Sequence, residues 1–281
     1  MLRKALVIAA AFGLLASGGQ ALAKTTWSEP KDAHWSFEGP FGKFDTAQVQ
    51  RGYKVYHDVC SACHAMSLMH YYNLGQLGGP FYKEGVKPTD NPYVKAIAKD
   101  FQVPDIDQDT GDAINRPATP SDRFKSPFAN EAAARASNGG ALPPDLSDII
   151  KARENGPAYV YSILTGYVAT PAGLTVPAGK AYNPFMHGDL TSYWSGAKDH
   201  VPVGGFIAMP FQLTADRVTF DDGTKATTEQ EAKDVVAFLA WASDPHQVER
   251  KQMGFAVIIY LLIFAGIVYA SYRKMWRKIE H

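Results

Sequence analysis

The apolar residues of this chain gather in two uncharged runs near its ends, and shorter amphipathic segments fill the part between them. The run at residues 253–272 has twenty residues without a charge. At a rise of about 1.5 Å per residue it covers roughly 30 Å, which matches the hydrocarbon core of a bilayer. Because the run has no polar face and contains tyrosines that suit a membrane interface, it predicts a transmembrane helix and not a buried core helix.

The run at the other end, residues 5–16, is too short to span a membrane. It follows Arg3 and Lys4 and precedes Ala21-Leu22-Ala23, which is the order of a secretory signal peptide cleaved after Ala23. Basic residues beyond the long run predict a cytoplasmic C-terminal tail: Arg273, Lys274, Arg277 and Lys278. The expected organisation is a signal peptide (residues 1–23), an exported domain (24–252), a membrane anchor (253–272) and a cytoplasmic tail (273–281).

Within the exported domain the pattern predicts a mostly α-helical fold with long loops. Helical spacing of apolar residues is found at residues 47–59, 91–101, 130–137, 157–165 and 227–243, and the last segment is the clearest. Glycine and proline break the chain elsewhere, so residues 24–44 are expected to be an extended arm, 102–123 an exposed acidic loop and 170–205 irregular. A strand signal is visible only around residues 218–220, and it is weak.

Charge alters this picture in one respect. The chain has 28 basic and 28 acidic residues, so its formal net charge is zero. The signal peptide carries +2 and the tail +3, which leaves −5 on the predicted exported domain. An acidic surface favours a basic soluble partner, although the same acidity can simply aid solubility. Four aspartates gather in the predicted loop at 102–123, namely Asp105, Asp107, Asp109 and Asp112. No pattern typical of nucleic-acid binding is present.

The sequence Cys60-Ser61-Ala62-Cys63-His64 contains the only two cysteines and reads C-x-x-C-H. Two thiols at this spacing can each form a thioether to a vinyl group of one porphyrin, and His64 can then ligate the iron on the proximal side. The motif therefore predicts one covalent haem c. Export of the domain agrees with this prediction.

Three other interpretations of the cysteines are weaker. A thioredoxin-like redox pair is expected at a strand-to-helix turn, whereas the residues before Cys60 have helical spacing. A structural zinc site needs further cysteines or histidines at ligand spacing. A structural disulfide between cysteines this close is uncommon.

An electron-carrying haem usually has a second axial ligand, for which the residues leave several candidates. Methionines close to His64 or at the membrane are excluded by position: Met66, Met69, Met253 and Met275. Met209 is favoured because glycines before it and Pro210 after it predict a fixed, extended loop, and Met186 remains an alternative. Four histidines also remain possible, His57, His70, His187 and His200. A thioether ligand would stabilise ferrous iron and raise the reduction potential relative to two imidazoles.

Blocks over nearly the whole exported part resemble the cytochrome c1 family, the membrane-anchored haem subunit of the cytochrome bc1 complex. They are CSACHAM (60–66), AAARASNGGALPPDLS (132–147), LTGY (164–167), YNP (182–184), IAMP (207–210) and FDDGT (220–224). The resemblance implies that Met209 is the distal ligand and that Arg135 lies near a haem propionate, a role that suits a guanidinium. Two departures leave open how the Met209 loop is held. Pro210-Phe211 follows the methionine where many relatives have Ala-Pro-Pro or Pro-Pro, and no cysteine is present for a disulfide that some bacterial relatives have there.

The resemblance also implies a function and a location. The haem would accept one electron from a Rieske iron–sulfur protein and pass it to a soluble, basic cytochrome c, without bond chemistry on a substrate. Cytochrome b would be a partner in a dimeric complex. With the signal peptide, it implies a bacterial inner membrane and a periplasmic haem domain. Two other functions remain to be separated from this one, a haem enzyme or sensor with an open iron site and a membrane-anchored thiol oxidoreductase.

Overall fold

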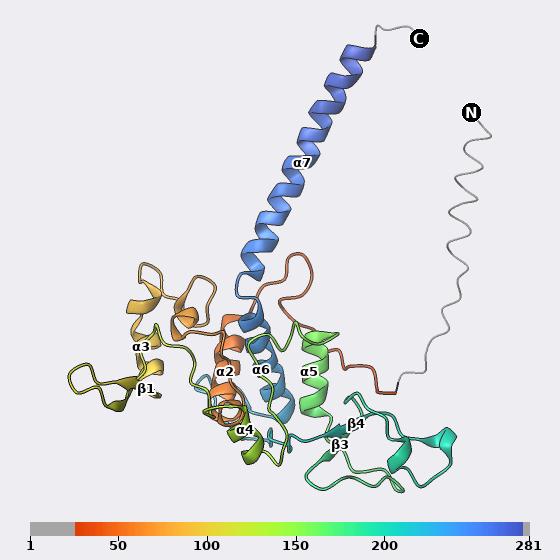
Figure 1. The fold of residues 1–281 in the computed structure, drawn as a ribbon. Coiled ribbons are helices and arrows are strands. Elements are labelled where there is room, and N and C mark those ends of the chain that lie inside the picture. The colour runs from red at the N-terminus through yellow and green to blue at the C-terminus, as the bar shows by residue number, and fades with distance from the viewer. Residues whose placement is uncertain (1–25, 278–281) are drawn as a thin grey trace.

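The computed structural model describes residues 26–277, so the predicted signal peptide and the last four residues lie outside the described part. A head of helices and long loops stands at the foot of one long helix (Figure 1). The helices are α2 (Thr46–Asp58), α3 (Pro92–Lys99), α4 (Glu131–Ser137), α5 (Gly156–Thr165), α6 (Thr228–Ser243) and α7 (Gln247–Trp276). The strands are β1 (Gln102–Ile106), β2 (Ala113–Pro117), β3 (Ala181–Asn183) and β4 (Gly205–Ile207). The fold is mostly helical, as the apolar spacing predicted.

Helices α2 and α6 form the centre of the head. The Asp45 carboxylate accepts hydrogen bonds from the backbone of Ala47 and Gln48 and so begins α2. The two helices approach so closely at Gly52 that an added Cβ would lie 1.9 Å from the carbonyl oxygen of Asp234. Arg51 closes the same contact with an ion pair of 2.7 Å to the buried Asp234 carboxylate. A glycine and a buried ion pair therefore set the spacing of the helices that carry the rest of the head.

All five helices predicted for the exported domain are present, with bounds close to those expected. The predictions at residues 47–59, 91–101, 130–137, 157–165 and 227–243 correspond to α2, α3, α4, α5 and α6. Polar side chains begin several of them: Asn91 accepts from the backbone of Tyr93 at 3.0 Å, and Asn130 accepts from that of Ala133 at 2.9 Å. Local signals were sufficient here because capping and apolar spacing coincide.

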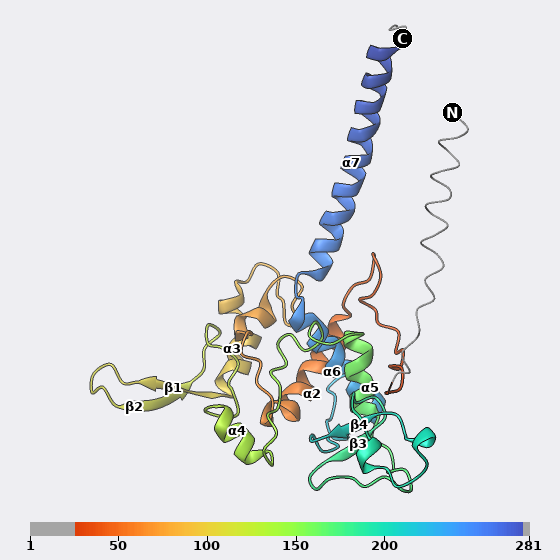
Figure 2. The ribbon, with the colours of Figure 1, turned by 45° about the vertical axis from the view of Figure 1, so that its right-hand side comes forward.

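The prediction of a plain acidic loop at residues 102–123 was wrong. Residues 102–106 and 113–117 pair as an antiparallel hairpin that projects from the head (Figure 2). Asp107 closes its turn by accepting from the backbone of Asp109 at 2.8 Å, and Asp105 pairs with Arg116 across the strands at 2.5 Å. The aspartates that suggested an exposed loop are thus partly used to build the hairpin, which a count of charges could not show.

The remaining strand predictions also need correction. The irregular segment at 170–205 contributes β3, which pairs antiparallel with β4, and residues 218–220 form no strand. The backbone N–H of Val218 donates instead to the buried carboxylate of Glu231 in α6 at 3.0 Å, so a side chain takes the place of a neighbouring strand. Val218 and Phe220 are buried because they pack into the main core.

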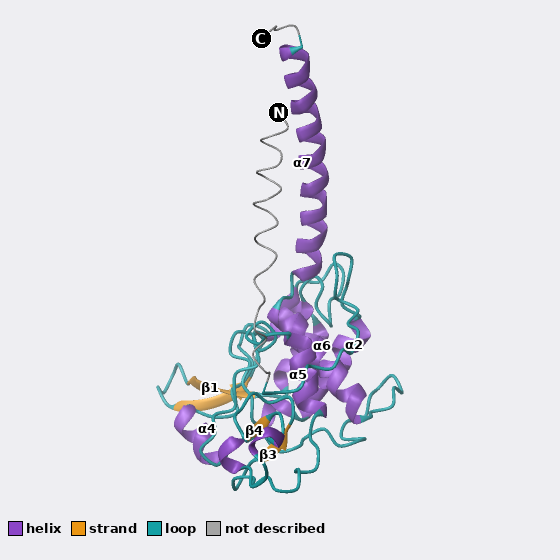
Figure 3. Cartoon of the chain, turned by 90° about the vertical axis from the view of Figure 1, so that its right-hand side faces the viewer, coloured by secondary structure: helices purple, strands orange, loops and turns teal. Residues whose placement is uncertain are grey.

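Helix α7 leaves the head and continues alone, as the side view in Figure 3 shows. It is 30 residues long, and in the described part of the chain it is the helix with the length and composition to cross a membrane. Its apolar residues are exposed along the whole run at 253–272. Exposure of so much apolar surface to water is unfavourable, whereas the core of a bilayer would cover it. The helix therefore agrees with a single membrane span.

Candidate haem site

The C-x-x-C-H motif forms a single tight turn directly after α2. Residues Cys60–Ala62 are a 3₁₀ turn, and the backbone N–H groups of Cys63 and His64 both donate to the carbonyl of Cys60, at 3.1 and 2.9 Å. Cys60 is half-buried and Cys63 is exposed. The turn therefore brings two thiols and one imidazole together on adjacent positions, which is the arrangement that attachment of one porphyrin requires.

The His64 ring is oriented by a backbone group from a distant part of the chain. Its Nδ1 lies 2.8 Å from the carbonyl oxygen of Pro144. Because a carbonyl can only accept, Nδ1 carries the proton and Nε2 keeps its lone pair for a metal. Burial lowers the pKa of His64, and the hydrogen bond to Pro144 opposes that effect only in part. A neutral, oriented imidazole is the form that ligates haem iron.

The segment that holds His64 runs alongside the motif over several residues. The backbone N–H of Leu146 donates to Ala65 at 2.8 Å, Ser67 donates to the Asp145 carboxylate at 2.8 Å, and Leu68 donates to the Ser147 hydroxyl at 3.1 Å. Burial opposes ionisation of Asp145, but hydrogen bonds from Ser147 and Ser67 outweigh it and lower its pKa. Residues 144–147 therefore fix the position of 64–68. The rigid Pro-Pro pair was visible in the sequence, but its pairing with the motif was not.

The surroundings of Cys60 do not suit a reactive thiolate. Burial, with a smaller contribution from Cys63, raises the pKa of the Cys60 thiol to about 12. A redox-active pair needs a cysteine whose pKa is lowered, because the thiolate is the reactive form. Among residues 26–277 there is also no group of three or more His, Cys, Asp and Glu side chains placed to hold a metal ion. The raised pKa of Cys60 thus argues against a reactive thiolate at this position.

Met209 lies two residues beyond β4, half-buried, in the loop that the sequence singled out. The Tyr167 hydroxyl donates to the Met209 carbonyl oxygen at 2.7 Å, and the rings of Tyr167 and Phe211 lie 5.2 Å apart. Burial raises the pKa of Tyr167, so the phenol stays protonated as a donor. On the other side of β4, Tyr182 donates to the Val203 carbonyl at 2.6 Å. Two tyrosine hydroxyls therefore hold the backbone on either side of β4.

Met186 has a different environment. Its sulfur lies 3.8 Å from the hydroxyl of Tyr159, within the range of a hydrogen bond to sulfur. The neighbouring His187 is enclosed by two aromatic rings, that of Trp27 at 3.9 Å and that of Tyr159 at 5.2 Å. Both side chains therefore already have partners in the packing of the arm against this loop.

The other histidines also have partners on the ring. His57 Nδ1 lies 2.7 Å from the Asp58 carboxylate, His70 Nδ1 lies 2.9 Å from the Ser121 carbonyl, and His200 Nδ1 lies 2.9 Å from the Asp199 carboxylate. Each of these contacts involves Nδ1, as in His64, so the hydrogen bonds alone do not separate these histidines from an iron ligand.

Arg135 is exposed on α4, where its guanidinium donates to the Gly140 carbonyl at 3.2 Å. This bond closes the turn after α4 and uses one of the five N–H donors of the guanidinium.

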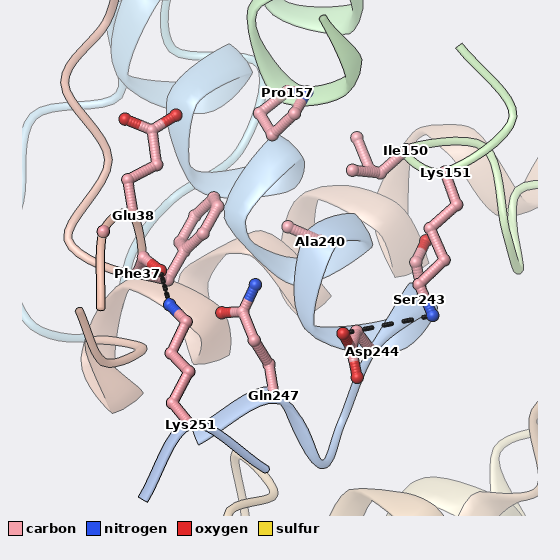
Figure 4. A pocket seen from close by; sticks show the side chains of 11 residues that line it. Phe37, Glu38, Ile150, Lys151, Pro157, Ala240, Ser243, Asp244, Gln247 and Lys251 are labelled. Atoms are coloured by element: carbon pink, nitrogen blue, oxygen red, sulfur yellow. Dashed lines mark hydrogen bonds and ion pairs between the residues drawn. The ribbon is translucent and has the colours of Figure 1, made fainter. Parts of the chain in front are cut away.

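Two pockets lie apart from the motif. One, of about 370 Å³, is lined by residues of the proximal segment and its neighbours, including Leu68, Pro144 and Arg153. Another, of about 430 Å³, lies at the foot of α7 between Phe37 and Gln247 (Figure 4). Neither pocket is lined by Cys60, Cys63 or His64. The candidate haem site is therefore identified by its ligand atoms and not by a cavity. Two thiols, a neutral imidazole and a thioether are a donor set that fits haem c.

Comparison with known proteins agrees with this donor set. The model of the cytochrome C1 family matches residues 35–279. The "Cytochrome c1" of Rhodospirillum rubrum is 40% identical over 284 residues, which cover 100% of this chain and 99% of that protein. A mitochondrial "Cytochrome c1 1, heme protein" of Arabidopsis thaliana is 42% identical over 247 residues, 88% of this chain and 72% of that protein.

One bacterial relative is longer. The "Cytochrome b/c1" of Bradyrhizobium diazoefficiens is 41% identical over 289 residues, which cover 96% of this chain. The chain spans only 39% of the length of that protein.

Proposed function

This chain belongs to the cytochrome c1 family, and we propose that it is the electron-carrying haem subunit of a cytochrome bc1 complex. Members of this family bind one covalent c-type haem, so the cofactor is haem c. The bound haem supplies one-electron redox chemistry, while the chain holds the ligands and sets their polarity and access. No residue of the chain is assigned a bond-making or bond-breaking step on a substrate.

Cys60 and Cys63 are proposed to attach the haem, and His64 to be its proximal ligand. The single observation that carries this assignment is the 2.8 Å hydrogen bond between His64 Nδ1 and the Pro144 carbonyl. It fixes the tautomer that offers Nε2, and it makes the imidazole a stronger donor. The turn at 60–64 then presents both thiols next to that ring.

Met209 is proposed as the distal ligand. Its loop is held through its backbone by Tyr167, which leaves the side chain to reach the iron, whereas the Met186 sulfur is already next to the Tyr159 hydroxyl. Arg135 is proposed to lie near a propionate, with its donors beyond the one to Gly140 available for a carboxylate.

The partners follow from the family and from charge. We infer that cytochrome b lies beside α7, that a Rieske iron–sulfur protein supplies the electron and that a soluble, basic cytochrome c receives it within a dimeric complex. The name of the Bradyrhizobium relative joins b and c1 in one chain, which supports the first of these partners. The net charge of −5 on residues 24–252 supports the last of them, because opposite charge raises the association rate.

The topology is proposed to be single-pass in a bacterial inner membrane. Arg273, Lys274 and Arg277 end the long apolar helix and favour the cytoplasm at that side. The haem domain, residues 24–252, then lies in the periplasm after removal of the signal peptide at 1–23. The anchor is residues 253–272 and the tail is 273–281.

A reduced-minus-oxidised spectrum of the purified full-length protein, with and without carbon monoxide, tests the function. We expect a c-type haem spectrum that carbon monoxide leaves unchanged, because both axial positions are filled. Ready binding of carbon monoxide would instead indicate an enzyme or sensor with an open iron site, and absence of haem absorbance would indicate a thiol oxidoreductase. Haem staining after denaturing electrophoresis tests the attachment, and Cys60→Ser with Cys63→Ser should abolish it.

A further inference from the structure

Residues 36–43 form a closed loop, here called the arm loop, on a fixed base. The backbone N–H of Lys43 donates to the Ser36 carbonyl at 2.9 Å and closes the loop. Phe37 is buried in the main core, and its ring lies 4.9 Å from that of Phe44 on the other side of the closure. The tip between these anchors is short, and a hydrogen bond from Gly42 to Gly39 at 3.4 Å tightens it. The loop is therefore a rigid projection.

The arm loop touches α7 at two points on one face of that helix. The Lys251 ammonium donates to the Phe37 carbonyl at 2.6 Å, as the dashed line in Figure 4 shows. One helical turn further along, the rings of Phe255 and Phe41 meet edge to face with their centroids 5.6 Å apart. Residues four apart on a helix share a face, so the loop lies along α7 and its tip points away from the head.

These contacts place Phe41 level with the start of the apolar run of α7. Lys251 is the last charged residue before the apolar run at 253–272, and Phe255 lies within the first turn of that run. Figure 2 shows the loop rising from the head beside the lower part of α7. Phe41 is nevertheless 73% exposed. A single exposed phenylalanine is ordinary on a soluble surface, but this one stands beside the first turn of a helix that suits a bilayer.

We propose that the arm loop enters the interfacial layer of the membrane that α7 crosses, with Phe41 as the inserted side chain. The occupant of this surface is phospholipid, because the surface is continuous with the exposed apolar residues of α7 at 253–272. Aromatic rings are favoured at that depth, and Glu38 and Lys43, which are exposed on either side of the tip, suit the headgroups. With the arm loop inserted beside α7, the head contacts the membrane at two places, which limits its rotation about the single helix. The inference rests on α7 spanning a membrane and not on the haem.

Nitroxide accessibility measures the depth directly. Phe41→Cys is labelled in the full-length holoprotein, where both native cysteines are used in thioethers, and is reconstituted into phosphatidylcholine–phosphatidylglycerol liposomes. Unsubstituted holoprotein is the labelling blank. Tyr260→Cys gives the value within the span. Ile106→Cys is the matched control for an exposed apolar residue, because Ile106 is 58% exposed and lies on the hairpin strand β1, away from α7 in Figure 1.

We expect the Phe41→Cys label to collide several-fold more often with oxygen, relative to water-soluble nickel chelate, than the Ile106→Cys label does. A ratio equal to that of Ile106→Cys would overturn the proposal. Protection from both reagents in native membranes would also overturn it, because a protein subunit and not lipid would then cover Phe41. If the Tyr260→Cys label itself were accessible to the chelate, the span would be wrong and the proposal would fall with it. An unchanged haem spectrum of Phe41→Cys shows that the head is folded in each case.

Discussion

The two sides of the proposed iron site are held in different ways. On the proximal side, residues 60–68 follow α2 and are hydrogen-bonded to residues 144–147, and Leu146 of that segment belongs to the main core. On the distal side, the loop around Met209 continues from the short β3–β4 pair, whose own buried cluster consists of Leu174, Tyr182 and Leu190. The main core includes more than thirty buried residues by comparison, so the two sides are supported by hydrophobic clusters of very different size.

From this difference we expect one proposed iron ligand to be coupled to global folding and the other to local structure. A change on the proximal side disturbs the packing of α2 against α6, which the whole head depends on. A change on the distal side disturbs a few hydrogen bonds from side chains to backbone, so the loop can open while the head stays folded. Substitutions on the two sides should therefore separate stability from the properties of the iron.

The largest effect on stability is expected from Gly52→Ala. The new methyl group would lie 1.9 Å from the Asp234 carbonyl, so α2 and α6 must move apart. Overpacking of this kind costs about 1–3 kcal/mol, and a backbone obstacle places the change at the upper end. Denaturant unfolding of the wild type and of Gly52→Ala measures the loss of stability.

Gly204→Ala is the matched variant on the distal side. Gly204 has a φ of +113°, and an added Cβ would lie 2.5 Å from the Asn183 carbonyl oxygen, so the local conflict is of the same kind. We expect altered iron ligation with a smaller loss of global stability. Equal losses of stability in the two variants would contradict the separation of the two sides.

Met209→Leu should have the largest effect on the iron itself. Loss of a thioether that favours ferrous iron should lower the reduction potential and remove the weak long-wavelength band typical of oxidised haem with methionine ligation. Global stability should change little. Met186→Leu is the control, and if the band is lost there but survives in Met209→Leu, the assignment of the distal ligand is wrong.

Tyr167→Phe should have an intermediate effect. It removes the hydrogen bond to the Met209 carbonyl, which contributes about 1 kcal/mol to holding the loop. Since 1.4 kcal/mol corresponds to a factor of ten, cyanide should displace the methionine from oxidised iron about fivefold more readily. Tyr182→Phe removes a comparable hydrogen bond at the other end of β4 and should change cyanide affinity less. An affinity unchanged in Tyr167→Phe would show that the hydroxyl does not hold the ligand loop.

The smallest effect is expected from Asp145→Asn, and it should depend on pH. The folded protein lowers the pKa of Asp145, so its ionised form stabilises the fold above the unfolded pKa of about 3.9. That contribution is lost as the pH falls through the folded pKa. The difference in unfolding free energy between the wild type and Asp145→Asn should be present at neutral pH and shrink below pH of about 4. A difference that is constant over this range would exclude a role for the charge.

Much of the helical fold was predictable, and the failures have a common cause. Helices α2 to α6 follow from apolar spacing and local caps such as Asn130, which act within a few residues. The hairpin of β1 and β2 was missed because the ion pair between Asp105 and Arg116 appears only when the strands are paired. The strand signal at 218–220 failed because Glu231, which is fully buried, offers its carboxylate to the backbone of Val218.

The sequence by itself determined the chemistry and the local elements of this protein. Two cysteines three positions apart and the histidine after them form a haem-attachment motif, and twenty uncharged residues predict a membrane span. Both signals come from residues close together in the sequence. Only the tertiary structure decided which atoms orient and hold those groups: the Pro144 carbonyl on His64, the Tyr167 hydroxyl at Met209 and the Phe255 ring beside Phe41. These partners lie 80, 42 and 214 positions apart along the chain. Contacts across such separations form only when the whole core has closed, so no local pattern records them.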